Sequence, residues 1–482
     1  MTQSSKRPHV LLVTTDHWPG SLLGVCGHAC VRTPTLDQLA RNGVRFPRAY
    51  AETPVCVPAR RTLMTGCPPR THGDRVFTDM EMPALPTMAQ TFRDAGYQAY
   101  AVGKLHVHPQ RARIGFDDVI LAEEGRTQWG VTDDYEAYLT EQGLAGRQFL
   151  HGMGNNEYVN RPWHLDEEHH VTNWTTREMV RLIKRRDPTR PGFWYLSYCH
   201  PHPPLAPLRD YVDMYRERPI DTPSLGAWAD DPAALPQYLR QNRARGDMMS
   251  DQDMRTAKRA FYALCTHIDH QLRVAIGTLR EEGLLEDTII LFTSDHGDML
   301  GKHGLWAKRL FYEESAQVPM ILVGTESQGR DGTVAPDTLD DRLVGWQDVM
   351  PTLLGLAGVD TPETVEGSSM VSEKSCREAL YGEVGEGRNA TRMLHDGRYK
   401  LIYYPVGNRV QLFDLETDPE EFTDLSDSES HVELRRRLET ALMAELYGGD
   451  LEWVSDGALV GMPDEETAPG PNRGLSGQRG LH

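Results

Sequence analysis

The segment CVPARRTLMTG, residues 56–66, places a thiol beside a proline and two arginines. Pro58 suits the first turn of a helix because its missing N–H would have no partner there. Free N–H groups at a helix start carry partial positive charge, and Arg60 adds a cation with a bidentate donor fork. Such a setting lowers the pKa of a thiol or holds a tetrahedral oxyanion. Three roles stay open for Cys56: a packed structural thiol, a thiolate nucleophile, or another role such as metal ligand or precursor of a different nucleophile.

Reactive side chains directly follow several predicted strands. The apolar runs at 10–15, 97–103, 193–198 and 288–293 read as buried strands, and each leads into polar residues. The residues at these strand ends are Asp16, Lys104, His106, His200, His202, Asp295 and His296. Ligands bind at the carboxyl ends of the strands in an open parallel sheet. We therefore expect carboxylates, imidazoles and an ammonium group to converge on one edge.

Asp16, Asp295 and His296 form a predicted metal set. Carboxylate oxygens with one imidazole suit Ca²⁺, Mg²⁺ or Mn²⁺. The alternative is that Asp16 and Asp295 each cap a following helix. His17 is either a ligand or a bystander.

The elements that must position these residues alternate between short apolar runs and helical patterns. This alternation favours an α/β fold with a large, mostly parallel sheet flanked by helices. Helices are predicted at 34–43, 86–96, near 175–185, at roughly 254–282 and at 346–358.

The chain divides into three predicted parts. Residues 1–374 are expected to form the catalytic domain, with 109–175 as an insertion over the sheet edge that carries specificity loops. Residues 375–454 read as a smaller α+β domain with a short antiparallel sheet, because YKLIYYP and VQLFDLE resemble hairpin strands. Residues 455–482 are rich in glycine and proline and read as a tail.

The composition limits the partners and the compartment. A formal net charge of −19 argues against nucleic acid or an anionic membrane as a partner, so an anionic substrate needs a local basic site. The first apolar run is shorter than a signal-peptide core, and no run is long enough to span a membrane. The seven cysteines suit a reducing compartment, so we expect a cytoplasmic protein.

The motifs resemble those of the formylglycine-dependent sulfatases, in the alkaline-phosphatase-like superfamily. CVPARRTLMTG matches the signature Cys-x-Pro-x-Arg with Thr-Gly at the ninth and tenth positions after the cysteine. The resemblance continues through TTDHWPGSLLGVCGH, GKLH, Pro-His-Pro in SYCHPHPPL, TSDHGDMLG and GLWAKRLFYEES. It implies that a maturation enzyme oxidises Cys56 to formylglycine, whose hydrate attacks sulfur through one oxygen. The other hydroxyl then loses its proton and expels sulfate as the aldehyde re-forms.

The same resemblance implies the site roles. It makes Asp16, Asp295, His296 and the modified residue 56 the metal ligands. Arg60 and His106 would orient and deprotonate the hydrate, and Lys104 and Lys308 would bind sulfate oxygens. His202 would meet the bridging oxygen and protonate the leaving alcohol. His17 stands where many sulfatases have a second Asp, and His296 stands where many have Asn. We expect Ca²⁺, with Mn²⁺ or Mg²⁺ as alternatives.

The expected reaction is hydrolysis of a sulfate monoester to alcohol and inorganic sulfate. Phosphonate monoester or phosphodiester hydrolysis on the same scaffold is the first alternative, and a non-catalytic binding protein with unmodified Cys56 is the second. The expected substrate is small, with carbohydrate, aryl and alkyl sulfates all open. The expected protein partner is the formylglycine-generating enzyme, and the oligomeric state is left open.

Overall fold

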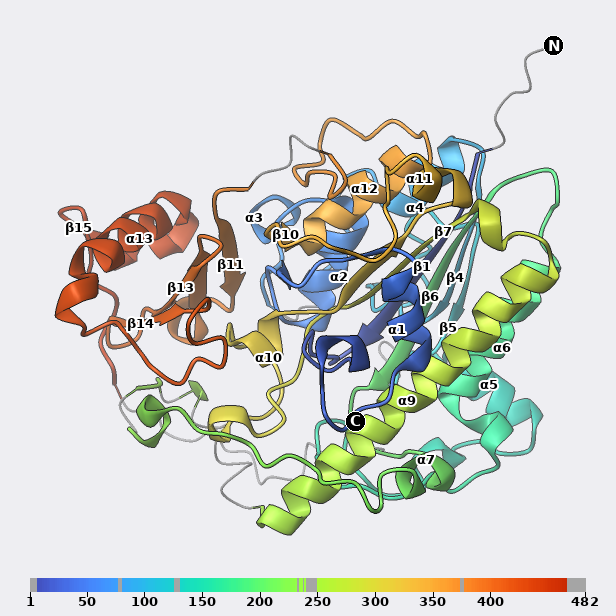
Figure 1. Ribbon diagram of the computed structural model, residues 1–482, viewed down its shortest axis with the longest axis horizontal. Coiled ribbons are helices and arrows are strands. Elements are labelled where there is room, and N and C mark those ends of the chain that lie inside the picture. The colour runs from blue at the N-terminus through green and yellow to red at the C-terminus, as the bar shows by residue number, and fades with distance from the viewer. Residues whose placement is uncertain are drawn as a thin grey trace.

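A computed structural model describes residues 7–76, 80–124, 131–231, 234–236, 238–239, 249–372 and 377–465 of the chain. Its main sheet runs β5-β4-β6-β1-β7-β8-β2-β9 (Figure 1). These strands are β1 (His9–Asp16), β2 (Val44–Arg45), β4 (Gln98–Gly103), β5 (Asp118–Leu121), β6 (Gly192–Pro201), β7 (Thr288–Ser294), β8 (Met320–Val323) and β9 (Thr338–Leu339). The run β5-β4-β6-β1-β7 is parallel and β8 is antiparallel to β7, which confirms the predicted mostly parallel sheet.

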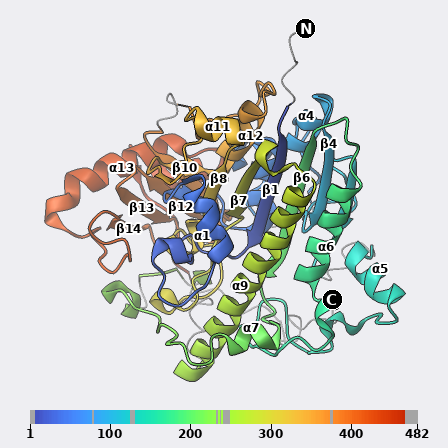
Figure 2. The ribbon, with the colours of Figure 1, turned by 45° about the vertical axis from the view of Figure 1, so that its right-hand side comes forward.

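Helices cover both faces of this sheet. One layer contains α1 (Pro34–Arg41), α6 (Val171–Lys184) and α9 (Asp251–Glu281), which cross in front of the strands in Figure 2. The other contains α2 (Cys56–Thr65), α4 (Met88–Asp94) and α12 (Val349–Leu356). Alternate residues of β1 divide between the two layers, because successive side chains of a strand point to opposite faces. Val10 and Leu12 pack with the α2 side, and Leu11 and Val13 with the α9 side.

The predicted helices are present, with small shifts at their ends. The long helix α9 begins at Asp251, three residues before its predicted start, because Ser250 and Asp253 form a capping box there. The remaining short helices are α3 (Pro69–His72), α5 (Asp134–Glu141), α7 (Arg209–Asp213), α10 (Glu313–Ala316) and α11 (Glu326–Arg330). No helix in the described part of the chain is long and apolar enough to cross a membrane.

A second, antiparallel sheet lies beside the main one, on the left in Figure 1. It consists of β11 (Leu380–Val384), β12 (Thr391–His395), β13 (Tyr399–Tyr404) and β14 (Arg409–Asp414), and it is covered by α13 (Val432–Glu445). The predicted α+β unit with a short antiparallel sheet is thereby confirmed. Two two-stranded pairs complete the set: β3 (Ala49–Tyr50) with β10 (Val344–Gly345), and β15 (Val454–Ser455) with β16 (Ala458–Leu459).

A buried ion cluster joins the second sheet to α10. Lys400 of β13 is fully buried, and its Nζ lies 2.6 Å from carboxylate oxygens of both Glu313 in α10 and Glu421. Burial raises the pKa of Glu421 to about 8, with Glu313 adding to the effect and Lys400 opposing it. Lys400 is therefore the shared cation of two carboxylates where the second sheet meets α10.

The predicted limits of the catalytic domain, the insertion and the tail can be compared with the structure only in part. The predicted boundary at 374/375 lies outside the described residues, as do 125–130 of the insertion and 466–482 of the tail. The insertion contributes β5, the outermost strand of the main sheet, as well as α5. The described start of the tail contains β16, so packed structure continues past residue 454.

Candidate active site

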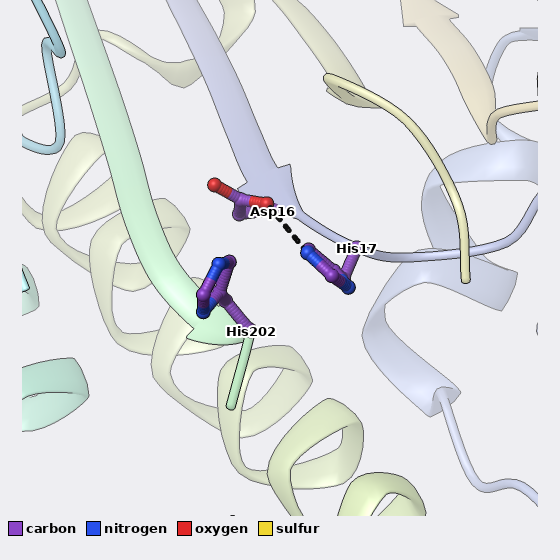
Figure 3. Close-up of side chains that lie close together, drawn as sticks. All are labelled: Asp16, His17 and His202. Carbon is purple, nitrogen blue, oxygen red and sulfur yellow. Dashed lines mark ion pairs between the residues drawn. The ribbon is translucent and has the colours of Figure 1, made fainter. Parts of the chain in front are cut away.

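Strand ends and a helix start meet at one edge of the main sheet. Asp16 closes β1, and Asp295 directly follows β7, with its N–H donating to Thr15 O at 3.1 Å. His202 follows β6, whose end pairs with Asp16 through Pro201. Figure 3 shows Asp16 at the tip of β1, with His17 and His202 beside it. The expected convergence at the carboxyl ends of the strands is present.

Two sets of donor atoms gather around Asp16. Ligand atoms of Asp16, Cys56 and His296 lie within 4.8 Å of one another, and so do those of Asp16, His17 and His202. The His296 Nε2 is 3.4 Å from Asp16 Oδ1 and 3.4 Å from Asp295 Oδ1. The Nδ1 of His296 lies 2.9 Å from Gly297 O, so this ring donates through Nδ1 and leaves Nε2 free to bind a cation.

The buried charges at this point fit a divalent cation. Within the described residues, Asp16 Oδ1, Asp295 Oδ1, His17 Nε2 and His296 Nε2 are buried without a hydrogen-bond partner. Burial and the neighbouring Asp16 raise the pKa of Asp295 to about 6. Burial alone would also raise the pKa of Asp16, but Lys104 and Lys308 outweigh it and hold that pKa well below its usual range. Unsatisfied buried carboxylates are costly, and a cation bound between them removes that cost.

Arg60 connects the helix start to the strand ends. Its Nε donates to Asp295 Oδ2 at 3.0 Å. Another guanidinium nitrogen donates to Lys104 O at 2.7 Å and Ser197 Oγ at 2.8 Å. The side chain is 2% exposed, so its donor fork fixes the relative positions of α2, β4 and β7 in a site shielded from water.

Cys56 is the first residue of α2 and is fully buried. The Lys308 Nζ lies 3.5 Å from its sulfur. Burial would raise the pKa of the thiol, but Lys308, Lys104 and His106 outweigh it and bring that pKa well below its usual value. The predicted electropositive environment of residue 56 is therefore present.

Lys104 and His106 enter the site from the turn after β4. Gly103 opens this turn with φ +101°, and a Cβ there would lie 1.8 Å from Ser197 O, so only glycine fits. The Lys104 ammonium bonds to Asp16, and to Glu124 Oε1 at 2.6 Å. The His106 side chain is buried, and its backbone N–H donates to Glu123 Oε1 at 2.8 Å.

The two histidines at the end of β6 differ in position, because His200 is still part of the strand and only His202 follows it. His202 packs edge-on against His17, with ring centroids 4.4 Å apart, and its Nδ1 is 3.6 Å from Glu124 Oε1. Burial lowers the pKa of His202 well below its usual value, and Glu124 only partly opposes this. His200 instead contacts His202 O at 3.0 Å and packs against His170, so the structure does not bring it into either donor group.

Sequence reasoning missed several residues of this site. Ser197 and Tyr195 sit two apart on β6 and both accept from Arg60, a spacing that could have been read from the strand period. Asp298, within the motif TSDHGD, bonds to His17 at 2.6 Å. Glu124 contacts Lys104 and His202 but lies in a segment with no recognisable pattern.

Comparison with known proteins identifies the family. The profile of the Sulfatase family matches residues 8–359, most of the chain. The chain belongs to the sulfatase family. A second profile, N-sulphoglucosamine sulphohydrolase, C-terminal, matches residues 301–446. This sulfatase is accordingly a sulfuric ester hydrolase, as the motifs predict.

Individual relatives agree with this assignment. An arylsulfatase of Clostridium perfringens is 34% identical over 479 residues, covering 95% of this sulfatase and 98% of the relative. A choline-sulfatase of Rhizobium meliloti is 30% identical over 445 residues, covering 88% and 83%. Among solved structures, the phosphonate monoester hydrolase of Agrobacterium radiobacter superposes with a TM-score of 0.73 at 22% identity, covering 95% of this sulfatase and 100% of that chain. The last similarity supports the alkaline-phosphatase-like fold.

Proposed function

We propose that this sulfatase hydrolyses small sulfate monoesters through a formylglycine formed from Cys56, beside one divalent cation. The observation that carries the proposal is the position of residue 56. It lies 3.5 Å from the Lys308 ammonium and within the donor group of Asp16 and His296. A formylglycine hydrate at this position supplies a nucleophilic oxygen and a second hydroxyl whose deprotonation later expels sulfate. The formylglycine-generating enzyme is then a required partner in maturation.

The cation would be held by Asp16, Asp295 and His296, together with residue 56, and His17 is the further candidate ligand. Once bound, it lowers the pKa of the hydrate and offsets the charge of the sulfate. Oxygen donors dominate this set, which favours Ca²⁺, whereas the imidazoles make Mn²⁺ the first alternative.

The remaining polar side chains have separate roles in the proposal. Lys308 and Lys104 bind sulfate oxygens and stabilise the charge that develops during transfer. Arg60 holds residue 56 and Asp295 in register, and His106 accepts a proton from the hydrate. His202 gives a proton to the leaving alcohol. Because burial lowers its pKa, an imidazolium at this position is a stronger acid than free histidine, and Glu124 is its counter-charge.

The alcohol part of the substrate is assigned to a cavity of about 690 Å³ beside residue 56. Its wall includes Val55 and Lys308, Asn156 from the insertion, and Glu386 from the C-terminal unit. A second hollow beside His202 measures about 40 Å³, which holds only a few water molecules. The polar wall of the larger cavity, which also includes Arg309, favours a hydroxylated or charged alcohol over a plain hydrocarbon.

The test begins with the mass of the peptide that carries residue 56, from protein made in its native host. Conversion of the thiol to the aldehyde lowers the mass by about 18 Da. Turnover of an aryl sulfate should scale with the converted fraction, and Cys56→Ala should abolish turnover while leaving the unfolding temperature unchanged. Full activity from unconverted protein would refute the formylglycine mechanism. Much faster turnover of an aryl phosphonate would favour the phosphonate alternative.

A further inference from the structure

We propose that Asp298 is a positioning residue that fixes the tautomer of His17 and makes His17 a metal ligand through Nε2. The proposal rests on the metal site of the proposed function. Asp298 also connects that site to the loop that carries Lys308 and to the insertion at 109–175.

The Asp298 carboxylate is fully buried and surrounded by donors. Its Oδ2 lies 2.6 Å from His17 Nδ1 and accepts the hydroxyl of Tyr158. Its Oδ1 accepts the backbone N–H groups of Leu300 at 3.0 Å and Ala307 at 3.2 Å. An ionised carboxylate can only accept hydrogen bonds, so the proton of the neutral His17 ring must lie on Nδ1.

This tautomer directs a ring-nitrogen lone pair of His17 toward the candidate metal ligands around Asp16. With Nδ1 protonated, the Nε2 of His17 carries the lone pair, and it lies 3.7 Å from Asp16 Oδ1. Figure 3 shows the ring turned toward Asp16. A carboxylate that accepts from the far nitrogen of an imidazole orients the ring and raises its basicity as a metal ligand.

The backbone around His17 is also held in one unusual conformation. His17 has φ +73°, the left-handed region that non-glycine residues rarely adopt. The next residue, Trp18, donates its N–H to Ser294 Oγ at 3.0 Å, which ties this turn to the end of β7. Such conformations persist where surrounding contacts fix them, and they concentrate at functional sites.

The same carboxylate reaches the residue before Lys308. Ala307 is also left-handed, with φ +67°, and its carbonyl accepts the N–H of Met299 at 3.0 Å. Asp298 therefore bonds at once to the candidate ligand His17, to the loop of Lys308, and to Tyr158 from the insertion. A change at Asp298 should disturb metal binding first through the tautomer of His17.

The decisive variant is Asp298→Asn, with Tyr158→Phe as the matched control. An amide group cannot accept from all four donors, so its NH₂ must face either His17 or the backbone N–H groups. We expect metal affinity, measured by calorimetric titration with Ca²⁺ and with Mn²⁺, to fall by about 10- to 100-fold. Tyr158→Phe keeps the bond from His17 and should change affinity by less than about threefold.

A double-mutant cycle separates positioning from a purely structural role. If Asp298 acts through His17, then His17→Ala combined with Asp298→Asn should bind metal no more weakly than His17→Ala alone. Additive losses would overturn the proposal.

Nitrogen NMR of the His17 ring in metal-free protein gives an independent readout. It should show a protonated Nδ1 in the wild type and lose that signature in Asp298→Asn. An unchanged tautomer in the variant would overturn the proposal. Failure of wild-type protein to bind either metal would count against the proposed metal site, and the NMR result would still decide the role of Asp298.

Discussion

Arg60 Nε donates to Asp295 Oδ2 at 3.0 Å, and this bond attaches the helix that begins with Cys56 to a candidate metal ligand at the end of β7. Arg60, a residue of the cysteine motif, is therefore also a fixed part of the candidate active site. Burial raises the pKa of the Asp295 carboxyl, and the Arg60 guanidinium opposes that rise. The cysteine motif and the candidate active site consequently share one side chain.

Arg60→Lys should lower turnover of an aryl sulfate by about 10²- to 10³-fold. Lysine keeps the charge but cannot reproduce the fork that bonds Asp295, Lys104 O and Ser197 at the same time. The rate should be expressed per converted residue 56, using the peptide mass, because Arg60 belongs to the motif that the proposed maturation enzyme would recognise. A fully converted variant with wild-type turnover would contradict the assigned role.

Lys308→Met should lower kcat by about 10²-fold or more, because the Lys308 ammonium lies 3.5 Å from the sulfur of Cys56. Lys308→Arg should recover part of the rate. Lys302→Met is the matched control, since Lys302 lies in the same loop but bonds to Ser224 and Glu420. Steady-state kinetics of all three variants would test this, and equal losses at 302 and 308 would indicate a general effect on the loop.

Arg309→Ala should raise KM for a sulfated sugar that carries a second anionic group by about tenfold, with kcat little changed. The Arg309 side chain is exposed on the cavity wall, and within the described residues its guanidinium forms no ion pair. A small aryl sulfate should show no such change, and Arg309→Lys should retain most of the affinity. An equal rise in KM for both substrates would argue against the assigned cavity.

Acid should destabilise the fold through buried neutral histidines. Burial lowers the pKa of His267 to about 3, with His200 and His270 adding to the effect. The unfolded chain gains a proton below its ordinary pKa near 6.5, while the folded chain does not. Stability is therefore full above that pH and is lost as the pH falls, by about 2 kcal/mol at pH 5 for one such group.

His267→Gln removes this titration while keeping a donor for Asn173, which the ring contacts at 2.5 Å. The fall in unfolding temperature between about pH 7.5 and pH 5.5 should be smaller in the variant than in the wild type. Scanning calorimetry at several pH values measures it. Identical pH slopes would show that His267 does not titrate on unfolding.

Much of the fold could be predicted from hydrophobic pattern alone. The runs at 10–13 and 289–292 are continuously apolar, which is typical of strands buried on both faces. The edge strand β5 was not predicted, because DVIL is short and its first residue is exposed. Short edge strands depend on their neighbour in the sheet more than on their own sequence.

The site was predictable where chemistry lies at a strand end, as for Asp16, Asp295 and His202. Asp298 was not, because a carboxylate four residues beyond the end of β7 has no visible partner until the chain folds. Glu124 and Tyr158 depend on the path of the insertion, which carries no periodic signal. The role of His17 could not be decided from sequence, since it depends on which of its ring nitrogens faces Asp298.

The triad of Lys400, Glu313 and Glu421 has a consequence for how sulfatases can be recombined. A hybrid that takes its C-terminal unit from another family member would bring its own residues to the positions of Lys400 and Glu421, whereas Glu313 would stay with the catalytic part. If the incoming residue at position 400 lacked a charge, Glu313 would lose its buried cation, at a cost of about 3–5 kcal/mol. The natural unit of exchange therefore includes α10 of the catalytic part, and a junction drawn between the two sheets would cut through it.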